Sequence, residues 1–514
     1  MKISSIQQLS VKSSVIHRNN LNNQSNSYHS SPNFTGYDFH KYGDSHIYIW
    51  QMDKLKKETQ LFPQDIEYRK KLMGNAGLNP VKQYMLRSII GPQEIKSILK
   101  RFDDNPDIYS VGEKDKNIIN HKMRANLHIH TTSSDGSLTV TELLDKAAEY
   151  ANKVKSDFPN ETEPFVIAIT DHDTTDGANE AIKVISEKPL KYKNLRVILG
   201  VEMTTFNNIA PDMVNSPTNT HVLLYGIDPN EPRLKDFIDG TKAKKLQIEK
   251  MMTDSANKSY EKYFGEKNFF SVNQAKEQYN AINKNIIGIY NGMERYFETK
   301  STVKQILLKD KYIVQSLKKH NMPTDIDGFM TKFSEFHTPR DGNNKVQKPI
   351  DTLPEFISAT IGIKEETVVN KILEGEKTQN FSDYKKSLKS NISEYKTAFT
   401  PKYHYIPNFD TIYYNLSNQS DVIMGVAHPV DTVKNIENSN DKYKFMTELY
   451  KKFKSDCKEK AQFTEAYYQS YKPGRKEFNA EEKTQKFFKM VGKTFNLLRT
   501  GSADSHGLSV FKRL

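Results

Sequence analysis

Short apolar runs that alternate with helical stretches are the feature that most restricts the fold of this chain. The apolar runs occupy residues 165–170, 195–201, 221–227 and 421–427, and a further strand is predicted at 124–130, where polar and apolar residues alternate. Helical patterns at about 139–148 and 178–186 separate the first three predicted strands. Because strands that alternate with helices form parallel βα units, the pattern predicts an α/β sheet or barrel.

Composition divides the chain into five parts around this pattern. The predicted parts are a disordered polar leader at 1–45, a helical N-terminal extension at 46–120, the first part of the barrel at 121–230, a lysine-rich helical insert at 231–410 and the second part of the barrel at 411–514. The leader is rich in Asn, Ser and Gln. Such a segment buries too little apolar surface to offset the entropy lost on ordering.

The overall composition excludes several classes of protein. Lys and Arg number 75 against 63 Asp and Glu, so the net charge is +12. This charge suits anionic partners, but the lysines are spread along the whole chain and support the idea only weakly. A single cysteine, Cys457, excludes a disulfide scaffold. Because no run approaches the roughly 18 apolar residues of a bilayer-spanning helix, and no apolar secretory core begins the chain, we expect a cytoplasmic protein with no membrane partner.

Motifs rich in histidine and acidic residues lie at the predicted strand ends. They are His128-Ile-His130 with Ser134-Asp135-Gly136, Asp171-His172-Asp173, Gly200-Val201-Glu202, His221, Ala427-His428-Pro429 and Asp504-Ser505-His506. In an α/β barrel the carboxyl ends of the strands form one rim, so residues far apart in sequence meet there. Imidazole and carboxylate groups without cysteine suit Zn²⁺, Mn²⁺ or Fe²⁺. The set therefore predicts a hydrolytic metal site.

The order of these motifs resembles that of the polymerase-and-histidinol-phosphatase (PHP) metal-dependent phosphoesterases, over roughly 124–230 and 415–508. Within that family, the segments 169–177 and 199–202 are most similar to the subfamily active on 5′-phosphorylated nucleotides and short RNA, and Glu465-Ala-Tyr-Tyr468 fits it too. The resemblance implies a distorted seven-stranded β/α (TIM-like) barrel, here interrupted by the helical insert. One departure is Ala503, where the family usually has serine directly before the aspartate.

The resemblance also implies a ligand set for two or three divalent transition-metal ions, Mn²⁺ first and Zn²⁺ or Fe²⁺ as alternatives. The first ion would take His128, His130, Glu202 and Asp504; the second Glu202 as a bridge, His221 and His428; the third Asp135, His172 and His506. We interpret Asp171 and Asp173 as supporting catalytic residues that orient the neighbouring imidazoles. The alternative for both is capping of a solvent-exposed turn.

The predicted activity is hydrolysis of phosphate esters of nucleotides or RNA 5′ ends by a metal-activated hydroxide, as a phosphatase or a 5′–3′ exonuclease. The expected partner is a phosphorylated nucleotide or short RNA. One alternative is a phosphatase for a small sugar- or amino-alcohol phosphate such as histidinol phosphate. Another is a non-catalytic binding protein with a relic metal site. We expect the barrel alone to hold the metals and the insert to govern which substrate enters.

Overall fold

The computed structural model describes most of the chain after the polar leader. The described residues are 62–73, 85–105, 125–157, 159, 164–212, 218–279, 286–337, 353–396, 406–433, 436–468, 482–502 and 504–506. The leader predicted at 1–45 and the unusual Ala503 lie outside these residues.

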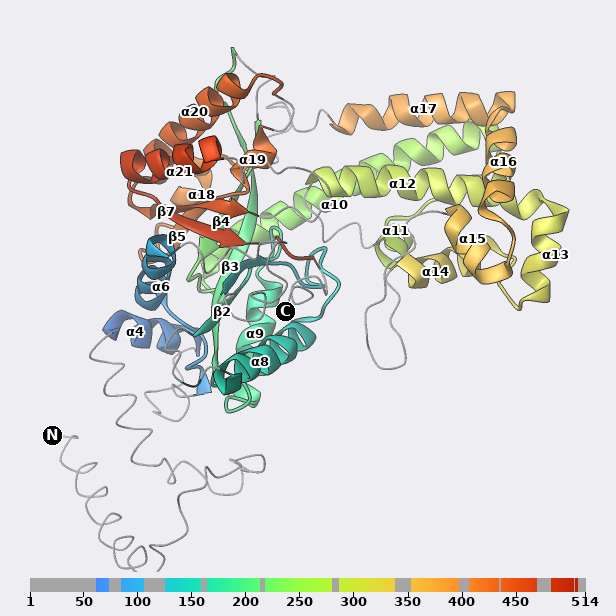
Figure 1. Cartoon of the computed structure of the whole chain (residues 1–514). Helices are drawn as coiled ribbons and strands as arrows, with labels where there is room; N and C mark the ends of the chain where they lie inside the picture. The colour runs from blue at the N-terminus through green and yellow to red at the C-terminus, as the bar shows by residue number, and fades with distance from the viewer. Residues whose placement is uncertain are drawn as a thin grey trace, which may run out of the picture. The chain divides into compact units, whose positions relative to one another are not determined.

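Seven strands form one mixed sheet, ordered in space as in the sequence (Figure 1). The strands are β1 (Ala125–Ile129), β2 (Phe165–Ile169), β3 (Leu195–Asn207), β4 (Thr218–Tyr225), β5 (Ile423–Ala427), β6 (Ala461–Tyr468) and β7 (Leu498–Ser502). An α/β fold with seven strands is thus confirmed. The pairing is parallel among β1, β2 and β3 and among β5, β6 and β7, as βα units predict, whereas β4 runs antiparallel to both β3 and β5. Only residues 208–217 separate β3 from β4, fewer than a parallel crossover requires.

The sheet curls until its first and last strands meet. Beyond β7, the Ser505 N–H donates to the carbonyl of His128 at 3.0 Å, and the His130 N–H donates to the carbonyl of Ser505 at 2.9 Å. These two bonds join the edge of β1 to the segment that follows β7. The result is a curled sheet, consistent with the expected distorted barrel and called the barrel below, in which His128, His130 and the motif around Ser505 are neighbours.

Helices cover the outer face of the curled sheet (Figure 1). They are α8 (Val140–Asp157), α9 (Asp176–Glu187), α18 (Phe409–Asn415), α19 (Pro429–Thr432), α20 (Ser439–Cys457) and α21 (Glu482–Phe495). The predicted start of α8 is a capping box, in which Thr139 and Glu142 exchange side-chain and backbone hydrogen bonds of 2.8 and 3.2 Å. Strand residues that point outward, such as Ile167 and Leu199, join the core beneath these helices.

One end of the barrel interior is filled by the N-terminal extension. The extension contributes α4 (Pro63–Leu72) and α6 (Pro92–Asp104). Apolar side chains of α6, including Ile95 and Phe102, pack with Ala125, Ile423 and other residues near the strand ends opposite the histidine motifs. An apolar plug at this end leaves the other end of the barrel for polar side chains.

The stretch between β4 and α18 is helical and has a hydrophobic core of its own. Its helices are α10 (Pro232–Phe264), α11 (Val272–Tyr279), α12 (Ile286–Gln305), α13 (Lys311–Lys319), α14 (Ile326–His337), α15 (Leu353–Ile361), α16 (Glu365–Glu376) and α17 (Gln379–Lys396). The long helix α10 joins two cores, since Leu234 and Ile238 pack with the barrel and Ile248 and Met252 with the second core. None of the described helices has the length and apolar content needed to cross a membrane.

Close packing inside the barrel yields a first prediction at Gly425 of β5. A Cβ atom at this position would lie 2.1 Å from a ring carbon of Phe463 on β6. We expect Gly425→Ala to lower the free energy of unfolding by about 1–3 kcal/mol, because the ring must move within a packed core. The matched control is Gly240→Ala on an exposed turn of α10, where a Cβ meets nothing within 4 Å and helix propensity favours alanine. Urea denaturation of both variants would contradict the prediction if Gly425→Ala were as stable as Gly240→Ala.

Candidate metal centre

The nine residues predicted as ligands converge at one end of the barrel. They form four overlapping groups whose ligand atoms lie within 4.8 Å of one another: His128, His130 and Asp504; His128, Glu202 and His428; His172, Glu202 and His221; and His130, Asp135, His172 and His506. Glu202 and His221 lie within β3 and β4, and the other seven lie at the ends of β1, β2, β5 and β7 or in the segments that follow them. Strand periodicity explains part of this, because residues two apart on a strand point to the same face.

Glu202 on β3 lies at the middle of the cluster, and its side chain is fully buried. Its Oε1 is 2.8 Å from Nδ1 of His221 and 2.9 Å from Nε2 of His428. Its Oε2 is 3.1 Å from Nε2 of His128 and 2.9 Å from Nδ1 of His172. The two oxygens therefore face different imidazoles, as a carboxylate that bridges two cations requires.

Asp504 completes one side of this cluster. Its Oδ1 is 3.1 Å from Nε2 of His130 and 3.6 Å from Nε2 of His128. Nε2 of His130 is also 3.3 Å from Oε2 of Glu202. These four residues are those assigned to a first ion by the sequence, and the structure brings them together.

Asp135 forms the centre of the outermost group. Its Oδ1 is 3.3 Å from Nε2 of His506, 3.7 Å from Nδ1 of His130 and 4.0 Å from Nε2 of His172. His172 thus presents one ring nitrogen to Asp135 and the other to Glu202. The group agrees with the third predicted set, with His130 as an additional neighbour.

Several buried polar atoms in the cluster have no hydrogen-bond partner among the described residues. They are Nε2 of His128, Nδ1 of His172, Oε2 of Glu202 and Oδ1 of Asp135. Buried polar atoms are normally satisfied, and leaving one unpaired costs about 1–3 kcal/mol. All four are nitrogen or oxygen donors of the kind that Mn²⁺, Fe²⁺ and Zn²⁺ accept. The residues present therefore fit divalent transition-metal ions.

Mutual electrostatic interaction shifts the pKa values of these groups strongly. Burial would raise the pKa of Glu202, but the neighbouring imidazoles hold it well below its usual range. Burial would lower the pKa of His130, but hydrogen bonds to Asp504 and Glu202 raise it to about 10. Burial would also lower the pKa of His428, but the hydrogen bond to Glu202 and its negative charge raise it to about 9. In the metal-free protein, protonated imidazoles supply the positive charge that buried carboxylates need.

Glu465 on β6 supports the cluster from behind, a role that the sequence did not assign to it. Each of its carboxylate oxygens lies 3.2 Å from Nδ1 of His128, and Oε2 accepts a hydrogen bond of 2.8 Å from the backbone N–H of His428. The Ser502 hydroxyl donates to its other oxygen. A carboxylate behind a ligating imidazole fixes the ring and its tautomer. The available signal was an acidic residue in the middle of a buried, partly apolar segment.

Asp171 and Asp173, predicted to support the neighbouring imidazoles, are both hydrogen-bonded within the barrel. Asp171 accepts hydrogen bonds from the backbone N–H of Thr131 at 2.7 Å and from the Ser134 hydroxyl at 2.7 Å. Asp173 accepts from the backbone N–H of Thr204 at 2.9 Å. These hydrogen bonds hold the loop after β1 and strand β3, so any effect of the two carboxylates on the imidazoles is indirect, and their supporting role stays a prediction. Both side chains are about 1% exposed, so neither caps a solvent-exposed turn.

Three of the eight described non-glycine residues with positive φ lie in these motifs. Asp173, His428 and Asp504 have φ angles of 47°, 27° and 44°. Non-glycine residues seldom adopt positive φ, at a cost of order 1–3 kcal/mol each, and such residues cluster at functional sites. The strain allows sharp turns directly at the strand ends, where the side chains must turn inward.

Two curated proteins are similar in sequence to part of this chain. A 3′,5′-nucleoside bisphosphate phosphatase from Chromobacterium violaceum is 32% identical over 127 residues, which cover 24% of this chain and 35% of that protein. A 5′-3′ exoribonuclease Rnm from Salmonella typhimurium is 33% identical over 119 residues, which cover 23% and 33%. The matched part spans about a third of the length of each relative.

Two solved structures are similar over more of the chain. An amidohydrolase from Chromobacterium violaceum, with bound sulfate and no metal, is 16% identical with a TM-score of 0.36, and the match covers 75% of this chain and 88% of that one. A metal-dependent phosphoesterase from Bifidobacterium adolescentis is 14% identical with a TM-score of 0.33, and covers 74% and 87%. No family model matches the sequence.

The different positions of Glu202 and Asp135 predict different effects of their loss. We expect Glu202→Gln to lose metal from the whole cluster, because both of its oxygens face ligand imidazoles. Asp135→Asn should release only the outermost ion and retain the others. Elemental analysis of both variants, purified without chelator, provides the measurement. A Glu202→Gln protein with native metal content would contradict the bridging position.

The raised pKa values predict that metal binding releases protons. His130 and His428, with pKa values of about 10 and about 9, are protonated at pH 7 in the metal-free protein. A ligating imidazole must be neutral, so binding at pH 7 should release about two protons from these residues. Affinity should rise with pH and level off above about pH 10. Calorimetric titration with Mn²⁺ in buffers of different ionisation enthalpy measures the release, and heats that do not depend on the buffer would contradict it.

Proposed function

We propose that this protein is a metal-dependent phosphoesterase that hydrolyses phosphate esters of nucleotides or RNA 5′ ends. The observation that carries the proposal is the buried Glu202, whose two oxygens face separate sets of imidazoles. The names of the two curated relatives, a nucleotide phosphatase and an exoribonuclease, support the substrate class.

The chemistry of such a site comes from the arrangement of its ligands. Bound divalent cations would supply a water of lowered pKa and would stabilise the negative charge that develops on the phosphate oxygens. Glu202 would hold two cations at a fixed separation, with His128, His130 and Asp504 on one side. His221 and His428 would lie on the other side. The outer group around Asp135 would hold a third, and Glu465 would keep the His128 ring in position.

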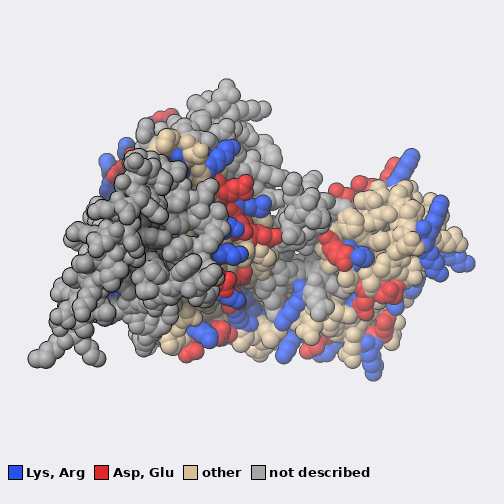
Figure 2. Space-filling view, turned by 90° about the horizontal axis from the view of Figure 1, so that it is seen from below, with Lys and Arg blue, Asp and Glu red and all other residues tan. Residues whose placement is uncertain are grey.

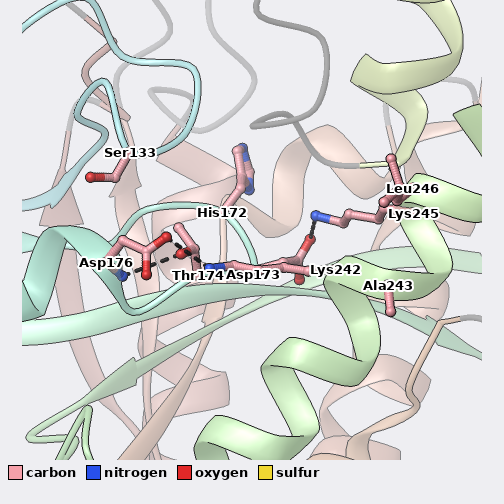
Figure 3. A pocket seen from close by; sticks show the side chains of 9 residues that line it. All are labelled: Ser133, His172, Asp173, Thr174, Asp176, Lys242, Ala243, Lys245 and Leu246. Carbon is pink, nitrogen blue, oxygen red and sulfur yellow. Dashed lines mark hydrogen bonds and ion pairs between the residues drawn. The ribbon is translucent and has the colours of Figure 1, made fainter. Parts of the chain in front are cut away.

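A cavity of about 260 Å³ provides access beside this cluster (Figure 3). His172 forms part of its lining, with Ser133 and Thr174 on the barrel side and Lys242 and Lys245 of α10 on the other. Because α10 begins the helical insert, the insert supplies one wall of the entrance. This supports the expectation that the insert selects the substrate.

The net charge contributes little to the proposal. On the face drawn in Figure 2, Lys and Arg are interspersed with Asp and Glu over the described surface and form no continuous basic stripe. A nucleic-acid-binding face is expected to gather basic residues on one side. The proposal therefore rests on the metal cluster, and Mn²⁺ is the ion that we expect it to use.

The proposed function predicts both metal content and a substrate preference. Protein purified without chelator should contain two or three transition-metal ions per chain. Loaded with Mn²⁺, it should hydrolyse 5′-phosphorylated nucleotides or short oligoribonucleotides faster than small phosphomonoesters such as histidinol phosphate. The measurement is phosphate or mononucleotide release across such a panel, with Glu202→Gln as the inactive control. Fewer than one metal per chain, with no activity restored by Mn²⁺, Zn²⁺ or Fe²⁺, would leave a non-catalytic binding protein as the better account.

A further inference from the structure

A buried ion pair connects the helical insert to the metal cluster. Lys245 lies on α10, and its Nζ is 2.7 Å from Oδ2 of Asp173, the residue that follows the candidate ligand His172. The side chains of Lys245 and Asp173 are 4% and 1% exposed. Figure 3 shows the lysine extending from α10 toward Asp173 across the edge of the cavity beside His172.

The same carboxylate is bonded to the strand that carries Glu202. Asp173 accepts hydrogen bonds of 2.9 Å from both the backbone N–H and the hydroxyl of Thr204, two residues beyond Glu202 on β3. The N–H of Asp173 donates to the carbonyl of Glu202 at 2.9 Å. Asp173 is therefore a junction of three elements, namely the loop with His172, strand β3 and helix α10.

We propose that Lys245 is a positioning residue of the metal centre, which holds Asp173 in place and thereby keeps His172 and Glu202 at their facing distance. This inference rests on the metal centre of the proposed function. Lys245 touches none of the nine candidate ligands in any contact described above. Its effect is exerted through the Asp173 carboxylate and the backbone bonds on either side of His172.

The burial of the pair explains why one residue of the insert has this influence. An ionised carboxylate that loses a hydrogen-bonded cationic partner inside a protein is strongly destabilised, and the surrounding structure rearranges to hydrate or neutralise it. At Asp173 such a rearrangement would disturb the bonds to Thr204 and Glu202. A change behind a metal ligand typically weakens metal affinity by about 10- to 100-fold.

The neighbouring Lys242 provides a matched control on the same helix. It also lies along the cavity, and its Nζ is 2.7 Å from Oδ2 of Asp176. The side chains of this second pair are 38% and 64% exposed. Exposed ion pairs contribute little to stability, and Asp176 follows the ligand His172 by four residues. Loss of Lys242 therefore removes a similar charge without disturbing the junction.

The test uses the full chain with Lys245→Met and Lys242→Met, depleted of metal and titrated with Mn²⁺. The electron paramagnetic resonance signal of free Mn²⁺ gives each binding constant. We expect the weakest Mn²⁺ site of Lys245→Met to lose about 10- to 100-fold in affinity, and Lys242→Met to stay within about threefold of the native protein. Equal affinities for Lys245→Met and the native protein would overturn the inference.

Two further variants separate positioning from simple loss of charge or of fold. In Asp173→Asn/Lys245→Met neither charge remains, so recovery of native affinity would mean that only the unpaired charge mattered, and the positioning role would be wrong. Persistently weak binding supports it. If Lys245→Met fails to fold, Lys245→Gln takes its place in the test, because glutamine keeps a hydrogen-bond donor. We expect Lys245→Gln to bind Mn²⁺ with intermediate affinity, and native affinity in this variant would overturn the inference. A native protein that binds less than one Mn²⁺ would instead refute the proposed metal centre.

Discussion

The buried carboxylate of Glu202 is the constraint on which the site depends. An ionised carboxylate in a protein interior is very unfavourable unless positive charge and hydrogen bonds surround it. Here five imidazoles lie within 3.3 Å of its oxygens, from His128, His130, His172, His221 and His428. These imidazoles come from strands or strand ends that are distant in sequence. They surround the Glu202 carboxylate only because the sheet curls and brings them together.

Glu202 also lies where the sheet changes direction. Residues 195–199 of β3 pair in parallel with β2, whereas residues 200–207 pair antiparallel with β4. Just beyond the end of β2, His172 forms an isolated bridge to Glu202, so the chain after β2 still follows β3 as it leaves the sheet. This geometry places His172 on one side of Glu202 and His221 of β4 on the other. The apolar plug from α6 fills the opposite end of the barrel, which leaves the polar side chains at a single end.

The sequence predicted strands correctly where their apolar residues form a recognisable pattern. The strands predicted at 124–130, 165–170 and 421–427 agree with β1, β2 and β5 within two residues at either end, because β1 alternates polar and apolar residues and β2 and β5 are short apolar runs. No strand was predicted from the sequence pattern at β6 or β7. β6 alternates polar and apolar residues around the inward-facing Glu465, and β7 reads Leu-Arg-Thr-Gly-Ser. Strands that line a polar site lack the apolar run by which a buried strand is recognised.

The supporting contacts could not be predicted, because they join residues that no local pattern relates. Glu465 is 337 positions from His128, and Lys245 is 72 positions from Asp173. A lysine in a lysine-rich helix looks like any solvated residue until the fold buries it. The helix α10 runs without interruption from the barrel core to the core of the insert. It therefore carries both a wall of the cavity and the lysine that is paired with Asp173 beside His172.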